Sequence, residues 1–386
     1  MADGTSQNIF IVGGGVVGAS IAFKIAQSPE WNVTLFEAAT KLGEGATAAA
    51  IGGITPQSES YCRGPLRHLA LWSTKIYPEF LETLELSSAM QIPVLDSGQL
   101  QVALTDDEME RILRSLLPSW EEEGFETIVL SATETLRVEP SLNRELCGSV
   151  LLPIEFALEP VILMNALTVA LANFTNVVVR KGVNISRITS SKSGACIETT
   201  SGERLNSDYV VIAAGIGSPA LLPSLKDRIY PMRGQALEFR TGYSGYPLNH
   251  HVYTSGEPTR SSYLVPRING RVVGGVTYEP NDERVIVDDL TLDRIVAGLA
   301  QLCPSSANWQ RMRSWSGIRP ASIDGIPFIG PMDEWSRIIS CSGHQGLGVT
   351  LAPACSIMVH NLVSLDSSSW SPEVALALAI CAPGRV

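Results

Sequence analysis

The N-terminal part of the chain combines apolar blocks with a helical pattern in the order typical of a βαβ unit. Ile9–Val12 is a continuous apolar run, which indicates a parallel strand buried on both faces. A helical pattern over Ala19–Gln27 follows, and a second apolar run, Val33–Phe36, ends at Glu37. We therefore expect an α/β fold that begins with a parallel sheet.

Strand-like alternation dominates the middle of the chain. A turn rich in Ser and Gly separates two alternating segments, which predicts a hairpin of Val183–Thr189 with Ala195–Thr200. The other expected elements are strands at Ala236–Arg240, Ser262–Pro266 and Arg271–Gly275, the last continuing through Tyr278, and helices at Asp106–Glu123 and Leu290–Leu302. This mixture predicts an α+β part in which helices lie beside a mostly antiparallel sheet. The Ser-, Pro- and Ala-rich tail, Ser364–Val386, is expected to be loosely ordered or to contact a partner.

Composition excludes several classes of protein. With 386 residues, 45% of them hydrophobic, the chain can form a sizeable core over two or three domains. Its net charge of −11 and lack of a basic run disfavour nucleic acids and anionic membranes. Seven irregularly spaced cysteines, without C-x-x-C, predict reduced thiols in a cytoplasmic protein. We expect no secretory signal, no integral membrane segment and no metal site.

The first predicted strand leads into a glycine-rich turn. Gly13, Gly15 and Gly18 satisfy G-x-G-x-x-G between that strand and the helix. The first glycine permits the tight turn, the second lets a pyrophosphate approach the backbone, and the third lets the helix pack on the strand. Glu37, at the end of the second strand, can accept hydrogen bonds from ribose hydroxyls. This pattern predicts a dinucleotide site but does not separate FAD from NAD.

Three later segments favour a flavin. Small residues fill Gly43–Gly53, a buried strand within Asp208–Ser218 ends in small residues, and a further strand–glycine turn–helix unit includes Ile338–Gly348. Small residues allow the backbone to lie close against a flat ring and its phosphate arm. These extra segments disfavour a nicotinamide-dependent dehydrogenase.

Taken in order, these segments resemble the D-amino-acid oxidase and glycine oxidase family of FAD enzymes. The resemblance also includes Arg233–Gln235, Tyr263–Arg267, Trp315–Pro320 and Asp324–Gly330, and it extends along nearly the whole chain. It implies a Rossmann-like FAD-binding domain beside an antiparallel-sheet substrate domain. Because the motifs lie at both ends of the chain, we assign 1–85, 145–225 and 317–386 to the first domain and 86–144 and 226–316 to the second.

The motifs and the resemblance together predict the cofactor contacts. They are Gly13, Gly15, Val16, Val17, Gly18, Glu37, Ala46, Thr47, Ala48, Gly52, Gly53, Val183, Ala213, Ala214, Gly215, Arg319, Gly343, His344, Gln345, Gly346, Leu347 and Gly348. We expect His344 to be a hydrogen-bonded scaffold residue rather than a base. Related sarcosine oxidases anchor their flavin through a Cys, but no Cys lies between positions 304 and 340 here. FAD is therefore expected to be bound non-covalently.

The resemblance also implies the groups that hold the substrate. Arg319 would pair with a substrate carboxylate, whose two oxygens suit a planar guanidinium, and the Tyr263 hydroxyl would bind the same group. Arg233 and Arg267 are expected to be structural. The chain departs from the glycine oxidase pattern at Gly346, where those enzymes generally have Arg, and at Tyr278, where they often have Met. Tyr278 is therefore a third candidate side chain of the substrate site, where it would narrow or polarise the pocket. Glycine, sarcosine, D-amino acids and D-proline-like compounds all remain open as substrates.

The implied activity is oxidative deamination of a small amino acid or secondary amine. A hydride would pass from the α-carbon to flavin N5, and O2 would reoxidise the flavin with release of H2O2. Two alternatives stay open: an amino-acid dehydrogenase that passes electrons to a quinone or carrier, and a biosynthetic flavoprotein that acts on an unusual amine. The oligomeric state is also open, a homo-oligomer being one alternative.

Overall fold

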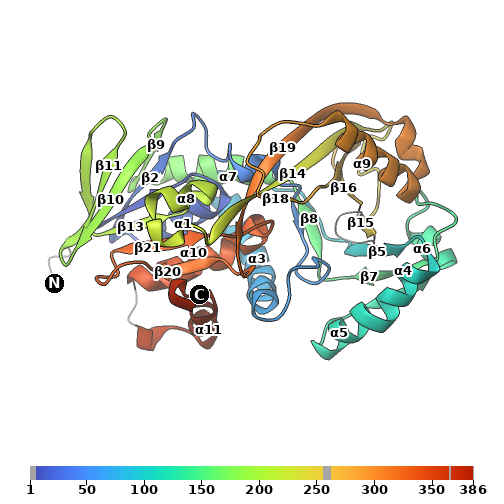
Figure 1. Ribbon diagram of the computed structural model, residues 1–386, viewed down its shortest axis with the longest axis horizontal. Helices are drawn as coiled ribbons and strands as arrows, with labels where there is room; N and C mark the ends of the chain where they lie inside the picture. The colour runs from blue at the N-terminus through green and yellow to red at the C-terminus, as the bar shows by residue number, and fades with distance from the viewer. Residues whose placement is uncertain (1–5, 255–261, 365–366, 386) are drawn as a thin grey trace.

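The computed structural model describes residues 6–254, 262–364 and 367–385, and its two main sheets lie side by side along the long axis of the molecule (Figure 1). The first sheet has six strands in the order β20-β21-β13-β1-β2-β9. Its parallel strands are β1 (Gln7–Val12), β2 (Trp31–Glu37), β9 (Val177–Lys181), β13 (Tyr209–Ile212) and β21 (Ile338–Ser342). The edge strand β20 (Phe328–Pro331) is antiparallel to β21.

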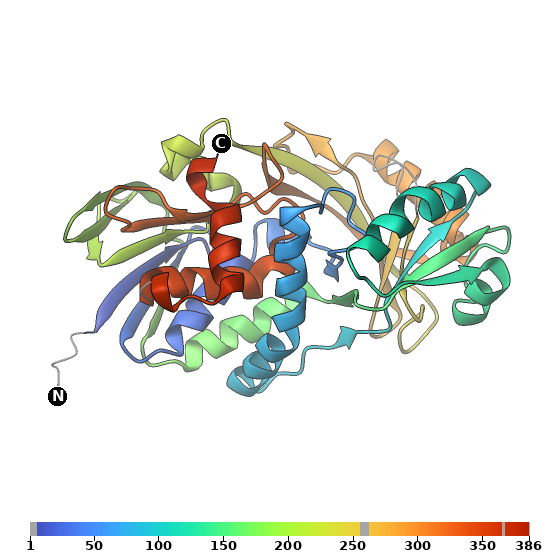
Figure 2. The ribbon, with the colours of Figure 1, turned by 90° about the horizontal axis from the view of Figure 1, so that it is seen from below.

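The two faces of this sheet contact different layers, because successive side chains of a strand point to opposite faces. Ile9 and Ile11 of β1 join the largest core cluster, which includes side chains of five helices, whereas Phe10 and Val12 join a second cluster. The helices of the first layer are α1 (Val16–Ala26), α3 (Pro65–Ser88), α7 (Pro160–Asn173), α10 (Gly348–Ser364) and α11 (Pro372–Cys381), gathered together in Figure 2. The second layer contains the small sheet β10 (Ile185–Ser191), β11 (Gly194–Thr199) and β12 (Arg204–Ser207), with α8 (Ser218–Leu221).

The second main sheet has nine strands and is mostly antiparallel, with β15 and β5 as a parallel pair. Its strands are β5 (Gln99–Ala103), β6 (Ile128–Ser131), β7 (Gly148–Leu152), β14 (Ile229–Arg240), β15 (His251–Thr254), β16 (Tyr263–Arg267), β17 (Arg271–Gly275), β18 (Glu279–Pro280) and β19 (Gln310–Ser322). Leu292, Ile295 and Leu299 of α9 (Asp289–Leu302) pack into the core of this sheet. The remaining helices are α2 (Ala46–Ala49), α4 (Asp106–Arg111), α5 (Leu117–Glu122) and α6 (Ala132–Val138), the π-helix Ile112–Leu116, and short 3-10 turns at Gly215–Gly217, Pro223–Leu225, Pro304–Asn308, Ser367–Ser369 and Pro383–Arg385.

Two long strands connect the halves of the molecule. β14 and β19 pair antiparallel over nearly their whole lengths and extend from the nine-stranded sheet toward the six-stranded one (Figure 1). Their register places Arg319 opposite Met232 and Gly317 opposite Gly234. β3 (Gly53–Ile54), β8 (Phe156–Leu158) and β4 (Val94–Leu95) form a small sheet, and Figure 1 shows β8 between the two main sheets. Arg319 therefore lies on β19, a strand of the nine-stranded sheet that extends toward the six-stranded sheet.

The mixed α/β class and both kinds of sheet predicted from the sequence are confirmed. The strand expected to continue through Tyr278 instead ends at Gly275, because Thr277 and Tyr278 belong to a loop. The tail is not loosely ordered over Pro372–Cys381: Val374, Leu378 and Cys381 are buried in the core. β7, assigned to the FAD-binding part by the proposed boundaries, pairs with β5 and β6 of the nine-stranded sheet, and the division into two domains stays a prediction. Within the described ranges, no helix combines the length and hydropathy needed to cross a bilayer.

Candidate active site

A cavity of about 500 Å3 lies at the carboxyl ends of the parallel strands β1 and β13. Ligands of open α/β sheets bind at this edge. Its wall combines the turn after β1, the end of β2 at Glu37, the small-residue segment around Thr47, and Gly346 before α10. Segments far apart in the sequence therefore form a single binding surface.

The glycine turn after β1 leaves its backbone open to this cavity. Gly13 adopts φ +109°, a conformation that favours glycine, and a Cβ there would collide with the carbonyl of Ala213. A Cβ on Gly18 would collide with the carbonyl of Gly13, so this glycine allows α1 to pack against the turn. Gly15 differs, because a Cβ there would meet only the Thr47 hydroxyl, at 3.3 Å. The second glycine of the motif is therefore the one that faces the open space.

A carboxylate lies at the end of β2 beside this turn. Oε2 of Glu37 accepts a hydrogen bond of 2.7 Å from the Gly14 backbone N–H, and Oε1 accepts one of 2.7 Å from Ala39. Glu37 also lines the cavity. These bonds fix the carboxylate at the cavity wall, where it can accept further hydrogen bonds from ribose hydroxyls.

Most of the predicted cofactor contacts lie on this cavity. The residues that line it are Gly13, Gly15, Val16, Val17, Glu37, Ala46, Thr47, Gly52, Gly53, Val183, Ala213, Ala214, Gly215, Arg319, His344, Gln345, Gly346, Leu347 and Gly348. Gly18, Ala48 and Gly343 are not among the lining residues. Gly18 supports the turn from behind, and Gly343 supplies a turn with φ +87°, so the sequence motif includes positions that shape the site without facing it.

The three predicted substrate-binding side chains meet in the same cavity. The Arg319 guanidinium carbon lies 4.7 Å from the ring centre of Tyr278, and its Nη1 donates to the Thr277 carbonyl at 3.1 Å. Tyr263 lines the same wall and stacks on Tyr253 with ring centres 4.6 Å apart. Burial alone would lower the pKa of Arg319, but the neighbouring tyrosines and Glu59 raise it above its ordinary value. Arg319 therefore presents a permanent positive charge to the cavity.

The shape and chemistry of the cavity fit FAD. The unobstructed backbone at Gly15 and the start of α1 offer N–H groups to a pyrophosphate, and Glu37 offers oxygens to a ribose. Over residues 8–362 the chain matches the family described as FAD dependent oxidoreductase. The chain belongs to this family.

Known relatives of this FAD-dependent oxidoreductase include glycine oxidases. The glycine oxidase of Geobacillus kaustophilus is 30% identical over 368 residues, which cover 94% of each chain. The glycine oxidase of Bacillus subtilis is 27% identical over 360 residues, 92% of each chain. The crystal structure of glycine oxidase from Geobacillus kaustophilus has a TM-score of 0.88 and 28% identity, and it covers 98% of this chain and 99% of that one. The predictions of the family, of FAD as cofactor and of oxidoreductase activity are confirmed.

Glu59 and Tyr61 are among the residues of the cavity that the sequence analysis did not predict. Glu59 accepts a 3.1 Å hydrogen bond from the Tyr278 hydroxyl, and Tyr61 lies with its ring centre 6.4 Å from that of Tyr278. Burial raises the pKa of Glu59 although Tyr278 and Arg319 both act to lower it. A Cβ on Gly346 would collide with the Tyr61 hydroxyl, so Tyr61 occupies the space that a side chain at 346 would need. The only signal in the sequence was their position shortly after the small-residue segment.

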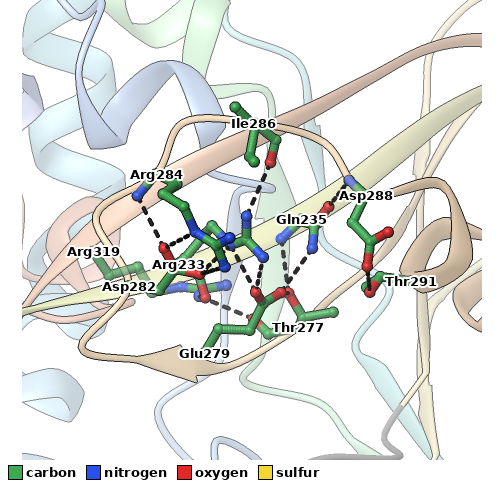
Figure 3. Close-up of polar contacts among 10 residues, drawn as sticks. All are labelled: Arg233, Gln235, Thr277, Glu279, Asp282, Arg284, Ile286, Asp288, Thr291 and Arg319. Atoms are coloured by element: carbon green, nitrogen blue, oxygen red, sulfur yellow. Dashed lines mark hydrogen bonds and ion pairs between the residues drawn. The ribbon is translucent and has the colours of Figure 1, made fainter.

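A buried ion-pair network supports the loop that carries Tyr278 (Figure 3). Arg233 on β14 pairs with Glu279 and, at 3.2 Å, with Asp282. Glu279 also accepts hydrogen bonds from Gln235 at 2.8 Å and Thr277 at 2.5 Å. Burial would raise the pKa of Glu279, but the hydrogen bonds of this network hold it below its ordinary value. Because the Thr277 carbonyl accepts from Arg319, the network also positions that guanidinium.

Arg233→Gln is expected to lower the free energy of unfolding by about 2–3 kcal/mol, because it leaves the partly buried Glu279 without its cation and Asp282 with Arg284 alone. It should also raise the substrate KM several-fold, since the Tyr278 loop loses its anchor. Thermal unfolding and steady-state kinetics of the FAD-loaded protein measure the two effects. Arg284→Gln is the matched control: its side chain is 64% exposed and pairs with Asp282, so it should leave the free energy of unfolding close to that of the wild type. Equal losses in both variants would contradict this account.

A second buried carboxylate holds the segment that leads to Glu59. Glu155 has no exposed surface, and its carboxylate accepts hydrogen bonds of 2.7 Å from the backbone of Gln57 and the backbone and hydroxyl of Ser58. Burial nevertheless raises the pKa of Glu155 to about 8. The folded protein therefore keeps a proton that the unfolded chain releases.

Glu155→Gln is expected to flatten the pH dependence of stability. In the wild type, the stabilisation from protonated Glu155 is complete below about pH 4.5 and is lost as pH rises through about 8. Glutamine mimics the protonated form, so the variant should lose less stability than the wild type over this window. Thermal unfolding of the FAD-loaded protein at several pH values measures the difference. The exposed Glu145→Gln is the control, and a wild-type slope in the Glu155 variant would contradict the assignment.

A cluster of buried sulfur atoms lies beside His344. Its Nε2 is 3.3 Å from Cys355 Sγ and 3.8 Å from Cys341 Sγ, and the three ligand-type atoms lie within 4.8 Å of one another. Burial raises the pKa of the Cys355 thiol, which disfavours the thiolate that a metal would need. We interpret the group as hydrogen bonding that orients His344, in line with its expected scaffold role, and the lack of a metal site stays a prediction.

Proposed function

We propose that this chain catalyses the oxidative deamination of a small amino acid or secondary amine. The observation that carries the proposal is the position of the Arg319 guanidinium. It lines the cavity of about 500 Å3, here called the flavin cavity, together with Tyr263 and Tyr278. A cation in this position suits a substrate that carries a carboxylate next to the amine to be oxidised. The similarity to glycine oxidases over more than nine-tenths of the chain supports the same substrate class.

Residues of this chain would orient the substrate. Nη1 of Arg319 donates hydrogen bonds to the carbonyls of Thr277, at 3.1 Å, and Arg233, at 3.4 Å, and these bonds fix the guanidinium plane. The N–H groups of Nη2 then serve the carboxylate, and the Tyr263 hydroxyl donates to the same group. Burial raises the pKa of Tyr263, so this hydroxyl keeps its proton at neutral pH. FAD, when bound, supplies the electron-accepting chemistry for oxidation at the α-carbon.

The electron acceptor is part of the proposal. We propose that O2 reoxidises the flavin with release of H2O2, that FAD is held without a covalent bond, and that the protein works in the cytoplasm. Acid precipitation should release all of the FAD into the supernatant. Retention of yellow colour in the pellet would contradict non-covalent binding.

The decisive experiment uses purified, FAD-loaded protein and a panel of glycine, sarcosine, D-alanine, D-proline and hydroxyproline isomers. At least one compound is expected to bleach the flavin anaerobically and to yield stoichiometric peroxide under air. Bleaching without peroxide, together with dye reduction under nitrogen, would favour the dehydrogenase. No bleaching by any member of the panel would favour a biosynthetic flavoprotein that acts on another amine.

A further inference from the structure

A second cavity of about 470 Å3, here called the outer chamber, adjoins the substrate end of the flavin cavity. Glu59, Tyr253, Tyr263 and Tyr278 line both cavities. The outer chamber is bounded by the segment before α3 and by the helical arm of α4 and α5, which lies beside the nine-stranded sheet in Figure 1. A group bound at Arg319 therefore lies next to the wall of a chamber large enough for the rest of a larger substrate.

The outer chamber is lined by positively charged side chains, although the chain as a whole is negatively charged. The protein has a net charge of −11, yet Arg63, Arg67 and Arg111 all line the outer chamber. Glu59 is the single acidic residue among the described lining residues. Burial raises the pKa of Glu59, and its carboxyl group already accepts a hydrogen bond from the Tyr278 hydroxyl. The lining of the chamber therefore contains more cationic than acidic side chains.

Two of the three arginines are available to a ligand. Arg67 is only 5% exposed and donates to Glu123 at 2.6 Å and to the Cys62 carbonyl at 2.8 Å. Across the described ranges, the side chains of Arg63 and Arg111 make neither a hydrogen bond nor an ion pair within the protein. A structural arginine of this chain, such as Arg233, instead has a carboxylate partner.

The other lining residues suit a polar ligand rather than an apolar side chain. They include Ser60, Ser115, Ser119 and Gln101, beside the apolar Leu116 and Trp120 and the tyrosines that the chamber shares with the flavin cavity. Gln57 belongs to the same lining and is 1% exposed, and its amide nitrogen and oxygen both lack a hydrogen-bond partner among the described residues. Buried amides normally have partners, so this one is a candidate to bind a ligand.

We propose that the outer chamber is a second anion subsite, and that the preferred substrate is an amino acid or amine with a second carboxylate or comparable anion at the end away from Arg319. This inference rests on the proposed function, because it places the first carboxylate at Arg319. The second anion is carried either on the side chain or on the nitrogen substituent, and both positions give the ligand the same chemistry. Arg63 and Arg111 bind it, with Arg67 behind them.

The test compares pairs of compounds that differ only in that charge. D-glutamate is paired with D-glutamine, and iminodiacetate with its monoamide, as anaerobic reductants of the FAD-loaded enzyme. Glutarate and glutaramate, which carry no amine, are compared by the change that they cause in the flavin spectrum. In at least one of the two substrate pairs, and between glutarate and glutaramate, the dianion should bind at least about tenfold more tightly than its amide. The pair that shows the preference identifies the position of the second anion.

Two variants test whether the preference for the dianion arises in the outer chamber. The double variant Arg63→Gln/Arg111→Gln should reduce the dianion-to-amide ratio to about twofold or less. Arg114→Gln, whose side chain is 78% exposed and pairs with Glu110, is the matched control and should keep the wild-type ratio.

A dianion-to-amide ratio near one in the wild type, or a ratio that the double variant does not change, overturns the proposal. If glycine or sarcosine reduces the flavin while these ratios stay near one, only the subsite fails. If no amine reduces it, the proposed function fails, and the glutarate comparison alone decides whether the chamber binds anions.

Discussion

Gly15→Val is expected to yield a folded protein that no longer retains FAD. The fold should tolerate the side chain, because a Cβ at Gly15 meets only the Thr47 hydroxyl, at 3.3 Å, and a shift of that one side chain by a few tenths of an ångström relieves the contact. The same side chain would project into the cavity at the point where a pyrophosphate approaches the backbone. We expect at least a hundredfold weaker binding of FAD, seen as a colourless protein after reconstitution with an unchanged far-ultraviolet circular dichroism spectrum.

Two further glycine variants separate this effect from a general loss of structure. Gly242→Val makes the same change where a Cβ would meet nothing within 4 Å, and it should remain yellow. Gly18→Ala places a methyl group against the carbonyl of Gly13, so it should lower the unfolding temperature as well as the FAD content. A yellow Gly15→Val protein would show that the phosphate arm does not approach the backbone at this glycine.

The cofactor end of the site could be predicted from the sequence because its determinants are local. The apolar run of β1, the glycines of the turn and Glu37 follow one another at fixed spacing, and each has a role set by backbone geometry. The structure places Gly13, Gly15 and Glu37 on a common cavity, as this local pattern predicts. Arg319 and Tyr263 were found through resemblance rather than through spacing, since their proximity depends on how β19 and β16 are arranged in the nine-stranded sheet.

The remaining features depend on tertiary contacts that leave no regular pattern. Glu59 and Tyr61 lie in an irregular segment whose position is set by Glu155, a residue almost a hundred positions away. The network around Arg233 likewise joins β14 to a loop whose residues show no periodicity. The tail was misjudged for a different reason: α11 is apolar on several faces, so its Ala-rich composition hid the buried positions Val374 and Leu378.

Arg319→Ala is expected to weaken substrate binding by roughly a hundredfold while FAD is retained. The change removes the cation that would pair with the substrate carboxylate and leaves the Tyr278 ring without its partner at 4.7 Å. Loss of a charge-assisted, two-pronged contact in a cavity costs about 3 kcal/mol, which corresponds to roughly a hundredfold increase in KM. Anaerobic flavin reduction at increasing concentrations of the best substrate measures this increase, and the flavin spectrum confirms that the cofactor is present.

Comparison with other arginine variants distinguishes a role of Arg319 in substrate binding from a purely structural one. Arg319→Lys keeps the positive charge but loses the planar fork, so it should recover part of the affinity. Arg313→Ala on the same strand removes an arginine that pairs with Glu238 outside the cavity, and its KM should match that of the wild type. If Arg319 only supported the loop at Thr277, the alanine variant would instead behave like Arg233→Gln, with lowered stability and only a several-fold change in KM. Saturable reduction of the Arg319→Ala flavin at wild-type concentrations of an amino acid would therefore rule out the carboxylate contact, because no other arginine among the described residues lines the flavin cavity.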